Sequence, residues 1–148
     1  MKHFYWSLIP LLLLTGCGGS DDSSSSYPSH DYSEVANKTI TYDQSFSIDE
    51  NDHFVYFYQE TCHNCQDLKN EVIDFALKGY MPFYFIVATS EIPSNYSSQE
   101  INKTIGSSNI DDVFVKVVPQ LVLIKEGKIA KNIIKNVYIQ EELSHYIN

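Results

Sequence analysis

The sequence predicts an α/β fold in which helices flank a central mixed β-sheet. Two runs of apolar and aromatic residues, 53–58 and 83–88, are each bounded by polar residues, as strands buried on both faces are. Between them, residues 65–76 carry apolar side chains at spacings of three and four, which is the period of a helix. Strand, helix and strand in succession indicate a layered α/β arrangement.

The first half of this pattern can be placed element by element. Residues 39–42 and 45–48 are short β-like runs that precede the strand at 53–58. The helix that follows is expected to end near Gly79, because glycine readily adopts the left-handed conformation that often closes a helix. The inward face of that helix carries Cys65, Leu68, Val72, Phe75 and Ala76.

The second half predicts a helix, a β-hairpin and a closing helix. The polar, mixed stretch before the hairpin contains one helix around residues 99–105. Apolar residues at 121–124 and 129–134 form two strands, joined by a tight turn at 125–128 with the sequence Lys-Glu-Gly-Lys. A short helix over 137–147 ends the chain, so the hairpin and this helix complete the predicted sheet and its cover.

The N-terminus has the composition of an export signal. Residues 1–3 carry positive charge, and the apolar run at 4–14 is shorter than the about 20 residues that a membrane-spanning helix needs. A Leu-Thr-Gly-Cys sequence ends at Cys17 and resembles the bacterial lipobox, whose cysteine is acylated. We expect a lipoprotein signal peptide over 1–16 and lipidation of Cys17, with a plain secretory signal or a buried N-terminal helix as the alternatives. The protein would then lie on the extracytoplasmic face of a bacterial membrane, anchored by lipid.

A lipidated flexible tether is expected over residues 17–33. This segment is small, polar and acidic, and it buries too little apolar surface to order itself. A Gly/Ser-rich chain of this length reaches on the order of 20 Å. His30, within it, is expected to be a solvated side chain. The globular domain is expected over residues 34–148.

The charge of the chain argues against nucleic acid as a partner. The chain has 10 basic residues, all of them lysine, against 19 acidic residues, for a formal net charge of −9. Binding to phosphates needs concentrated positive charge, which this composition does not supply.

Cys62 and Cys65 form a C-x-x-C pair at the predicted start of the helix. Thiol–disulfide exchange needs one thiolate that attacks a disulfide and a second thiol that releases the mixed disulfide. Cys62 is assigned as the nucleophile, because unpaired amides and the dipole of a helix N-terminus favour an anion. Cys65 falls one turn inside, on the apolar face, and is assigned as the resolving thiol. His63 either favours the thiolate or lies exposed without effect, and Asn64 shapes the turn.

Two other interpretations of the pair are less consistent with the sequence. Structural zinc takes four ligands, whereas the chain has one further cysteine, Cys17, and its remaining histidines are scattered. A disulfide across so short a ring would stabilise the fold weakly, because it closes little chain entropy. We therefore expect a redox pair that needs neither a metal nor another cofactor.

Residues 39–147 resemble the thioredoxin-like superfamily. Three features carry the resemblance in the right order: an aromatic strand that runs into C-x-x-C at 53–65, a Val-Pro pair that opens a strand at 118–124, and a hairpin before a terminal helix. The resemblance implies a thioredoxin-like fold. It also implies a cis bond before Pro119, which would set the backbone of Val118 beside the cysteines to pair with a substrate chain.

Two departures from the family pattern are visible near the cysteines. Thr61 stands where thioredoxins usually carry tryptophan, and Tyr56 stands where a buried acidic residue is common. The proton-transfer group and the redox direction, whether reducing, oxidising or isomerising, are therefore left open.

The function predicted from these features is that of a membrane-tethered, extracytoplasmic thiol–disulfide oxidoreductase. Its expected partners are the thiols or disulfides of exported proteins and a redox partner protein. The alternative is a thioredoxin-like accessory or binding subunit of a surface or export complex, in which the cysteine pair is a regulatory switch. Turnover of a model disulfide separates the two.

Overall fold

The structure is a computed structural model that describes residues 27–89, 92, 102–113 and 115–147. The predicted signal peptide, the Cys17 anchor and the tether up to residue 26 lie outside the described residues. No helix of the described part is both long and apolar enough to cross a membrane.

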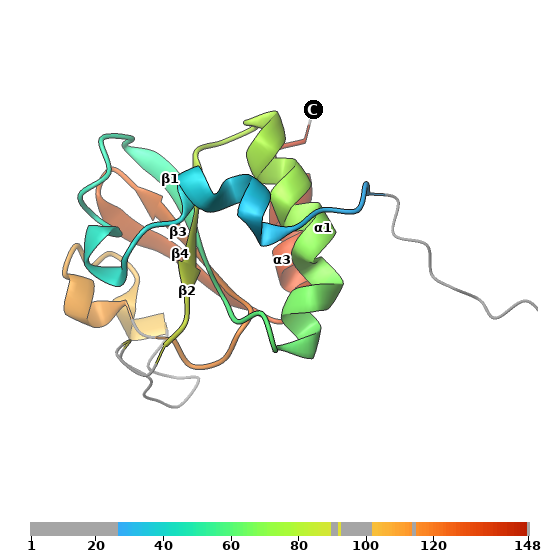
Figure 1. The fold of residues 1–148 in the computed structure, drawn as a ribbon. Coiled ribbons are helices and arrows are strands. Elements are labelled where there is room, and N and C mark those ends of the chain that lie inside the picture. The colour runs from blue at the N-terminus through green and yellow to red at the C-terminus, as the bar shows by residue number, and fades with distance from the viewer. Residues whose placement is uncertain (1–26, 90–91, 93–101, 114, 148) are drawn as a thin grey trace, which may run out of the picture.

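Four strands form one mixed sheet in the order β2-β1-β3-β4 (Figure 1). The central strand β1 (Asp52–Tyr58) pairs in parallel with β2 (Phe83–Val87) and antiparallel with β3 (Gln120–Lys125). β3 turns back into β4 (Lys128–Ile134) through the predicted tight hairpin. These strands confirm the predicted mixed sheet.

The two α-helices of the described chain lie together on one side of the sheet (Figure 1). α1 spans His63–Lys78, and α3 spans Asn136–Ser144. On the opposite face, the described residues include loops with short 3₁₀ turns. Of the helix expected around residues 99–105, residues 99–101 lie outside the described residues, and Asn102–Thr104 form a 3₁₀ turn. The predicted α/β arrangement is confirmed.

β1 is buried on both faces because its apolar side chains alternate between two cores. Phe54, Tyr56 and Tyr58 pack toward α1 and α3, whereas Val55 and Phe57 pack into the core on the other side of the sheet. A strand buried on both faces has a continuous run of apolar residues, and this run predicted β1 from the sequence.

α1 begins and ends where the sequence placed it. Cys62 precedes it in extended conformation as the N-cap, and Gly79 closes it in the left-handed region at φ 68°. Its predicted inward side chains are all buried: Cys65, Leu68, Val72, Phe75 and Ala76.

The two β-like runs before β1 are not strands in the structure. Of residues 39–42 and 45–48, Thr39 makes a single parallel bridge to Phe85, and the chain then enters a 3₁₀ turn at Tyr42–Gln44. The polar side chains of this turn hydrogen-bond to its own backbone, which competes with pairing along β2.

Part of the segment predicted to be a flexible tether packs against α1. The His30 backbone N–H donates to Asn70 Oδ1 at 2.8 Å. Tyr32 lies buried in the 3₁₀ helix η1 (Tyr32–Lys38). The His30 side chain is itself largely shielded from solvent, so it is not the solvated side chain expected from the sequence. The composition of this stretch predicted a tether, because its polar residues outnumber Tyr32, which packs in the core.

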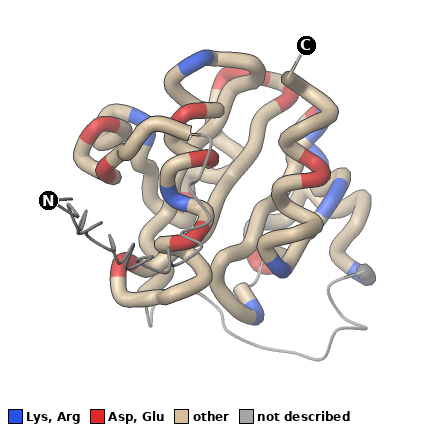
Figure 2. Tube along the Cα trace, turned by 90° about the vertical axis from the view of Figure 1, so that its right-hand side faces the viewer, with Lys and Arg blue, Asp and Glu red and all other residues tan. Residues whose placement is uncertain are grey.

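Figure 2 shows the positions of the lysines along the backbone of the described chain interspersed with those of acidic residues.

Leu68→Ala is expected to lower the free energy of unfolding by about 2–5 kcal/mol, because Leu68 is 1% exposed in the core beneath α1. Leu77 lies on the same helix and is 46% exposed, so Leu77→Ala should change stability by about 0.5 kcal/mol or less. Urea denaturation of the purified variants measures both. Equal effects for the two leucines would contradict the packing described here.

Candidate active site

Cys62 lies at the junction of three elements. As N-cap of α1 it follows the loop after β1, and its sulfur accepts a hydrogen bond from the Cys65 backbone N–H at 3.3 Å. The Cys62 thiol donates in turn to the Val118 carbonyl oxygen at 3.5 Å, across from the start of β3. An amide donor at a helix N-terminus favours the thiolate form of the sulfur that it contacts.

The loop that delivers Cys62 is held by its own hydrogen bonds. The Cys62 backbone N–H donates to the Gln59 carbonyl at 3.1 Å, and the Gln59 side chain donates to the Ala88 carbonyl at 2.9 Å. The Gln66 side chain donates to the Glu60 carbonyl at 2.6 Å. These contacts fix the loop to both β2 and α1, so the position of the sulfur is set by the sheet and the helix together.

Cys65 differs from Cys62 in its exposure to solvent. Both are free thiols, but Cys65 is fully buried, whereas Cys62 is partly exposed. Burial, and after it the contact with the Cys62 sulfur, raises the pKa of the Cys65 thiol to about 12. The Cys62 sulfur is therefore accessible, whereas the Cys65 sulfur is buried and stays protonated near neutral pH.

The Val118–Pro119 peptide bond is cis, as the family resemblance implied. Val118 contributes the carbonyl beside Cys62 and packs against both cores. Recesses lie on either side of it. One, of ≈ 430 Å³, lies between Asn64, Pro119 and Val137. The other, of ≈ 240 Å³, lies between Gln59, Ile92 and Val117.

His63 and Asn64, the residues between the cysteines, lie at the surface. The His63 side chain is 90% exposed, and its Nε2 is 3.7 Å from Asp67 Oδ2, one turn along α1. The Asn64 backbone carbonyl accepts a hydrogen bond from the Asn136 side chain at 3.0 Å, which ties the start of α1 to the start of α3. His63 therefore pairs with a carboxylate on its own helix, and Asn64 acts through its backbone.

Tyr32 is a site neighbour that the sequence analysis missed. Its hydroxyl donates to the Cys65 carbonyl at 3.4 Å, from a segment that had been assigned to the tether. A sequence signal for it exists: Asp31 and Glu34 form a capping box, and that spacing marks the start of a helix. Recognising this box would have moved the domain boundary to include Tyr32.

The described residues show no group of three or more His, Cys, Asp or Glu side chains placed to hold a metal ion. The groups that the structure places around the two sulfurs are backbone amides and carbonyls, with buried side chains beneath.

Solved structures similar to this chain include thioredoxins. Mitochondrial thioredoxin 3 from Saccharomyces cerevisiae, in its oxidised form, gives a TM-score of 0.49 at 15% identity over 77% of this chain and 97% of that one. Thioredoxin f from spinach chloroplast, in a short form, gives 0.49 at 12% identity over 75% and 93%. Plasmodium falciparum thioredoxin gives 0.49 at 18% identity over 74% and 98%.

No protein-family model matches the chain, and no curated protein matches its sequence. The mixed sheet, the helix that begins at the C-x-x-C pair and the cis bond before Pro119 agree with what the sequence resemblance implies.

Near neutral pH, iodoacetamide is expected to modify Cys62 of the reduced chain well before Cys65. Cys65 is buried and the pKa of its thiol is raised to about 12, so its reactive thiolate is scarce until the pH is far above neutral. Peptide mass spectrometry measures the two rates, with urea-unfolded chain as the control in which both sites should react alike. Faster labelling of Cys65 in the folded chain would reverse the assignment.

Proposed function

We propose that this chain is a thiol–disulfide oxidoreductase in which Cys62 attacks and Cys65 resolves. The observation that carries the proposal is the placement of the Cys62 sulfur. It lies at a helix N-terminus, 3.3 Å from the Cys65 amide and 3.5 Å from the Val118 carbonyl, with Cys65 buried one turn behind it. This arrangement separates an accessible nucleophile from a shielded second thiol, which is what exchange through a mixed disulfide requires.

In the reducing direction, the Cys62 thiolate attacks one sulfur of a substrate disulfide. The substrate S–S bond breaks, a Cys62–substrate disulfide forms, and the other substrate sulfur leaves and takes up a proton. Cys65 then gives up its proton and attacks the Cys62 sulfur. The Cys62–substrate bond breaks, the Cys62–Cys65 disulfide forms, and the second substrate sulfur leaves as a thiol. The substrate gains two electrons and the cysteine pair loses two.

The same steps in reverse pass a disulfide from the oxidised pair to a substrate dithiol. Either direction needs a second protein that returns the pair to its starting state, a dithiol donor for reduction or a disulfide donor for oxidation. The redox partner protein expected from the sequence fills this role.

A polypeptide is the substrate that the surroundings of Cys62 fit best. The Val118 carbonyl lies beside the sulfur, and recesses on both sides of it can receive side chains of an extended chain. Val117 and Val137 are exposed at these recesses and give apolar contact next to the backbone contact. A substrate chain held in this way would place its disulfide in line with Cys62.

We further propose that the domain works at the extracytoplasmic face of a bacterial membrane, on exported proteins. The support is the export signal and the lipobox-like sequence that ends at Cys17. Lipid on Cys17 would hold the domain near the bilayer through the polar stretch that follows.

Cys65→Ser is expected to accumulate a mixed disulfide between Cys62 and a protein substrate, because the thiol that releases it is gone. Cys62→Ser should form no such adduct and should abolish turnover. Non-reducing gels and mass spectrometry of the chain after incubation with a model protein disulfide provide the measurement. Full turnover by the Cys62→Ser variant would contradict the proposed mechanism.

Cys17→Ser is expected to abolish incorporation of labelled fatty acid in a bacterial host and to move the protein out of the detergent phase. The reason is that the variant has no thiol to accept the lipid. Ser20→Ala, in the adjacent polar stretch, is the matched control and should behave like wild type. A Cys17→Ser protein that is still processed and membrane-bound would refute the lipid anchor while leaving the redox proposal standing.

A further inference from the structure

A stack of tyrosines lies in the core beneath the C-x-x-C pair. Tyr32 stacks on Tyr58 with ring centroids 3.9 Å apart and an interplanar angle of 19°. Tyr56 stacks on Tyr58 from within β1, with centroids 6.2 Å apart and an angle of 11°. All three side chains are buried in the same cluster as Cys65, with Cys62 packed against it.

Tyr56 is the member of this stack whose hydroxyl is unpaired. The residue is 0% exposed, and its hydroxyl makes no hydrogen bond in the described structure. The neighbouring Tyr32 hydroxyl donates instead to the Cys65 backbone carbonyl at 3.4 Å. A buried donor without an acceptor costs about 1–3 kcal/mol, and phenylalanine at this position would avoid that cost.

The Tyr56 hydroxyl is a proton donor throughout the neutral range. Burial raises its pKa, and the neighbouring Tyr32 and Cys65 raise the pKa further. Tyr56 and Cys65 are both fully buried in the same core cluster between β1 and α1. A thiol in this cluster accepts hydrogen bonds weakly as long as it is protonated and strongly once it is a thiolate.

We propose that the Tyr56 hydroxyl donates a hydrogen bond to the Cys65 thiolate during the resolving step. This inference rests on the proposed function and identifies the group that stabilises its second sulfur. Cys65 loses its proton, which ends on the departing substrate sulfur. The Cys65 sulfur bonds to Cys62 as the Cys62–substrate bond breaks. Tyr56 keeps its own proton throughout, so it acts as a donor and not as a base.

A neutral donor has a different effect from a buried carboxylate. A carboxylate can take up the Cys65 proton, but once ionised it repels the thiolate that it helps to form. The phenol lowers the energy of the thiolate at every pH below its own raised pKa. The resolving step of this chain should therefore follow the ionisation of sulfur alone across the acidic and neutral range.

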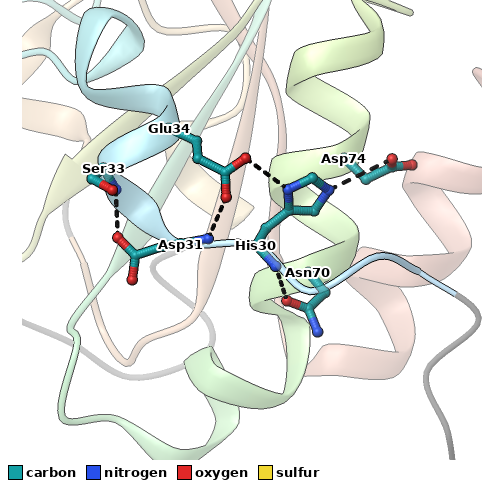
Figure 3. A network of polar contacts seen from close by, with 6 residues as sticks. All are labelled: His30, Asp31, Ser33, Glu34, Asn70 and Asp74. Carbon is teal, nitrogen blue, oxygen red and sulfur yellow. Dashed lines mark hydrogen bonds and ion pairs between the residues drawn. The ribbon is translucent and has the colours of Figure 1, made fainter.

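The N-terminal segment helps to keep water from the tyrosine stack. The His30 ring bridges two carboxylates, with Nδ1 3.1 Å from Glu34 Oε2 and Nε2 3.8 Å from Asp74 Oδ1 (Figure 3). The His30 backbone N–H binds Asn70, also on α1. These contacts fasten the segment that carries Tyr32 into the core, where it covers the stack.

The test compares Tyr56→Phe with wild type in the full chain. In a Cys62→Ala background, the alkylation rate of Cys65 as a function of pH reports the Cys65 thiolate directly and needs no turnover. Tyr56→Phe should reduce this rate at a given pH by roughly tenfold or more, the range of a hydrogen bond to a charged group. With Cys62 present, formation of the mixed disulfide should be unchanged and its resolution slowed by a similar factor.

Tyr58→Phe is the matched control, because it removes a phenol from the same strand and the same stack. Burial, and after it the negative charges of Glu60 and Asp31, raises the pKa of Tyr58. This variant should leave both rates unchanged. Tyr56→Phe should also unfold at the same or a higher urea concentration than wild type, because it removes an unpaired buried hydroxyl.

Unchanged Cys65 alkylation in Tyr56→Phe overturns the proposal, and so does equal slowing by Tyr58→Phe, which would assign the effect to ring packing. Absence of exchange in the wild-type chain would instead refute the proposed function. The alkylation comparison would still decide whether Tyr56 stabilises the Cys65 thiolate.

Discussion

The burial of β1 on both faces is the constraint on which the site depends. β1 pairs with β2 on one edge and β3 on the other, and its side chains fill both cores. Because β2 is parallel to β1, the carboxyl ends of both strands reach the same edge of the sheet. Because β3 is antiparallel, it begins at that edge, where Gln120 lies opposite Phe57. The loop with Cys62 and the loop with Pro119 are therefore brought together by strand direction.

The two cysteines lie within one turn of α1, but their surroundings differ. Cys62 caps the helix, where an amide supports negative charge, and Cys65 lies on the apolar face that packs α1 on the sheet. The periodicity that buries α1 thus buries the second thiol as well. Packing and reactivity cannot be separated here, since the same face that stabilises the helix keeps Cys65 protonated.

The core beneath the two cysteines contains three tyrosines, which combine a ring that packs with a polar hydroxyl. Tyr32, Tyr56 and Tyr58 are buried and stack on one another in the core that packs against α1, and each brings a hydroxyl with it. One of these hydroxyls binds the Cys65 backbone, and another is left without a partner. Aromatic rings supply the stability of the core, while their polar ends set the surroundings of the sulfur.

The sequence by itself determined the buried strands, the limits of α1 and the place of the cysteines along it. These follow from local periodicity, from glycine at the helix end and from the spacing of the pair, all of which lie within short windows of the chain. The β-like runs predicted at 39–42 and 45–48 are not strands, and residues 30–33, predicted as tether, pack on the domain. In both segments polar side chains outnumber the few residues that pack.

Only the tertiary structure decided that Tyr32 reaches Cys65 and that the Val118 carbonyl faces Cys62. Each of these contacts joins residues more than 30 positions apart. Such contacts depend on how the elements pack and not on the order of residues within any one of them.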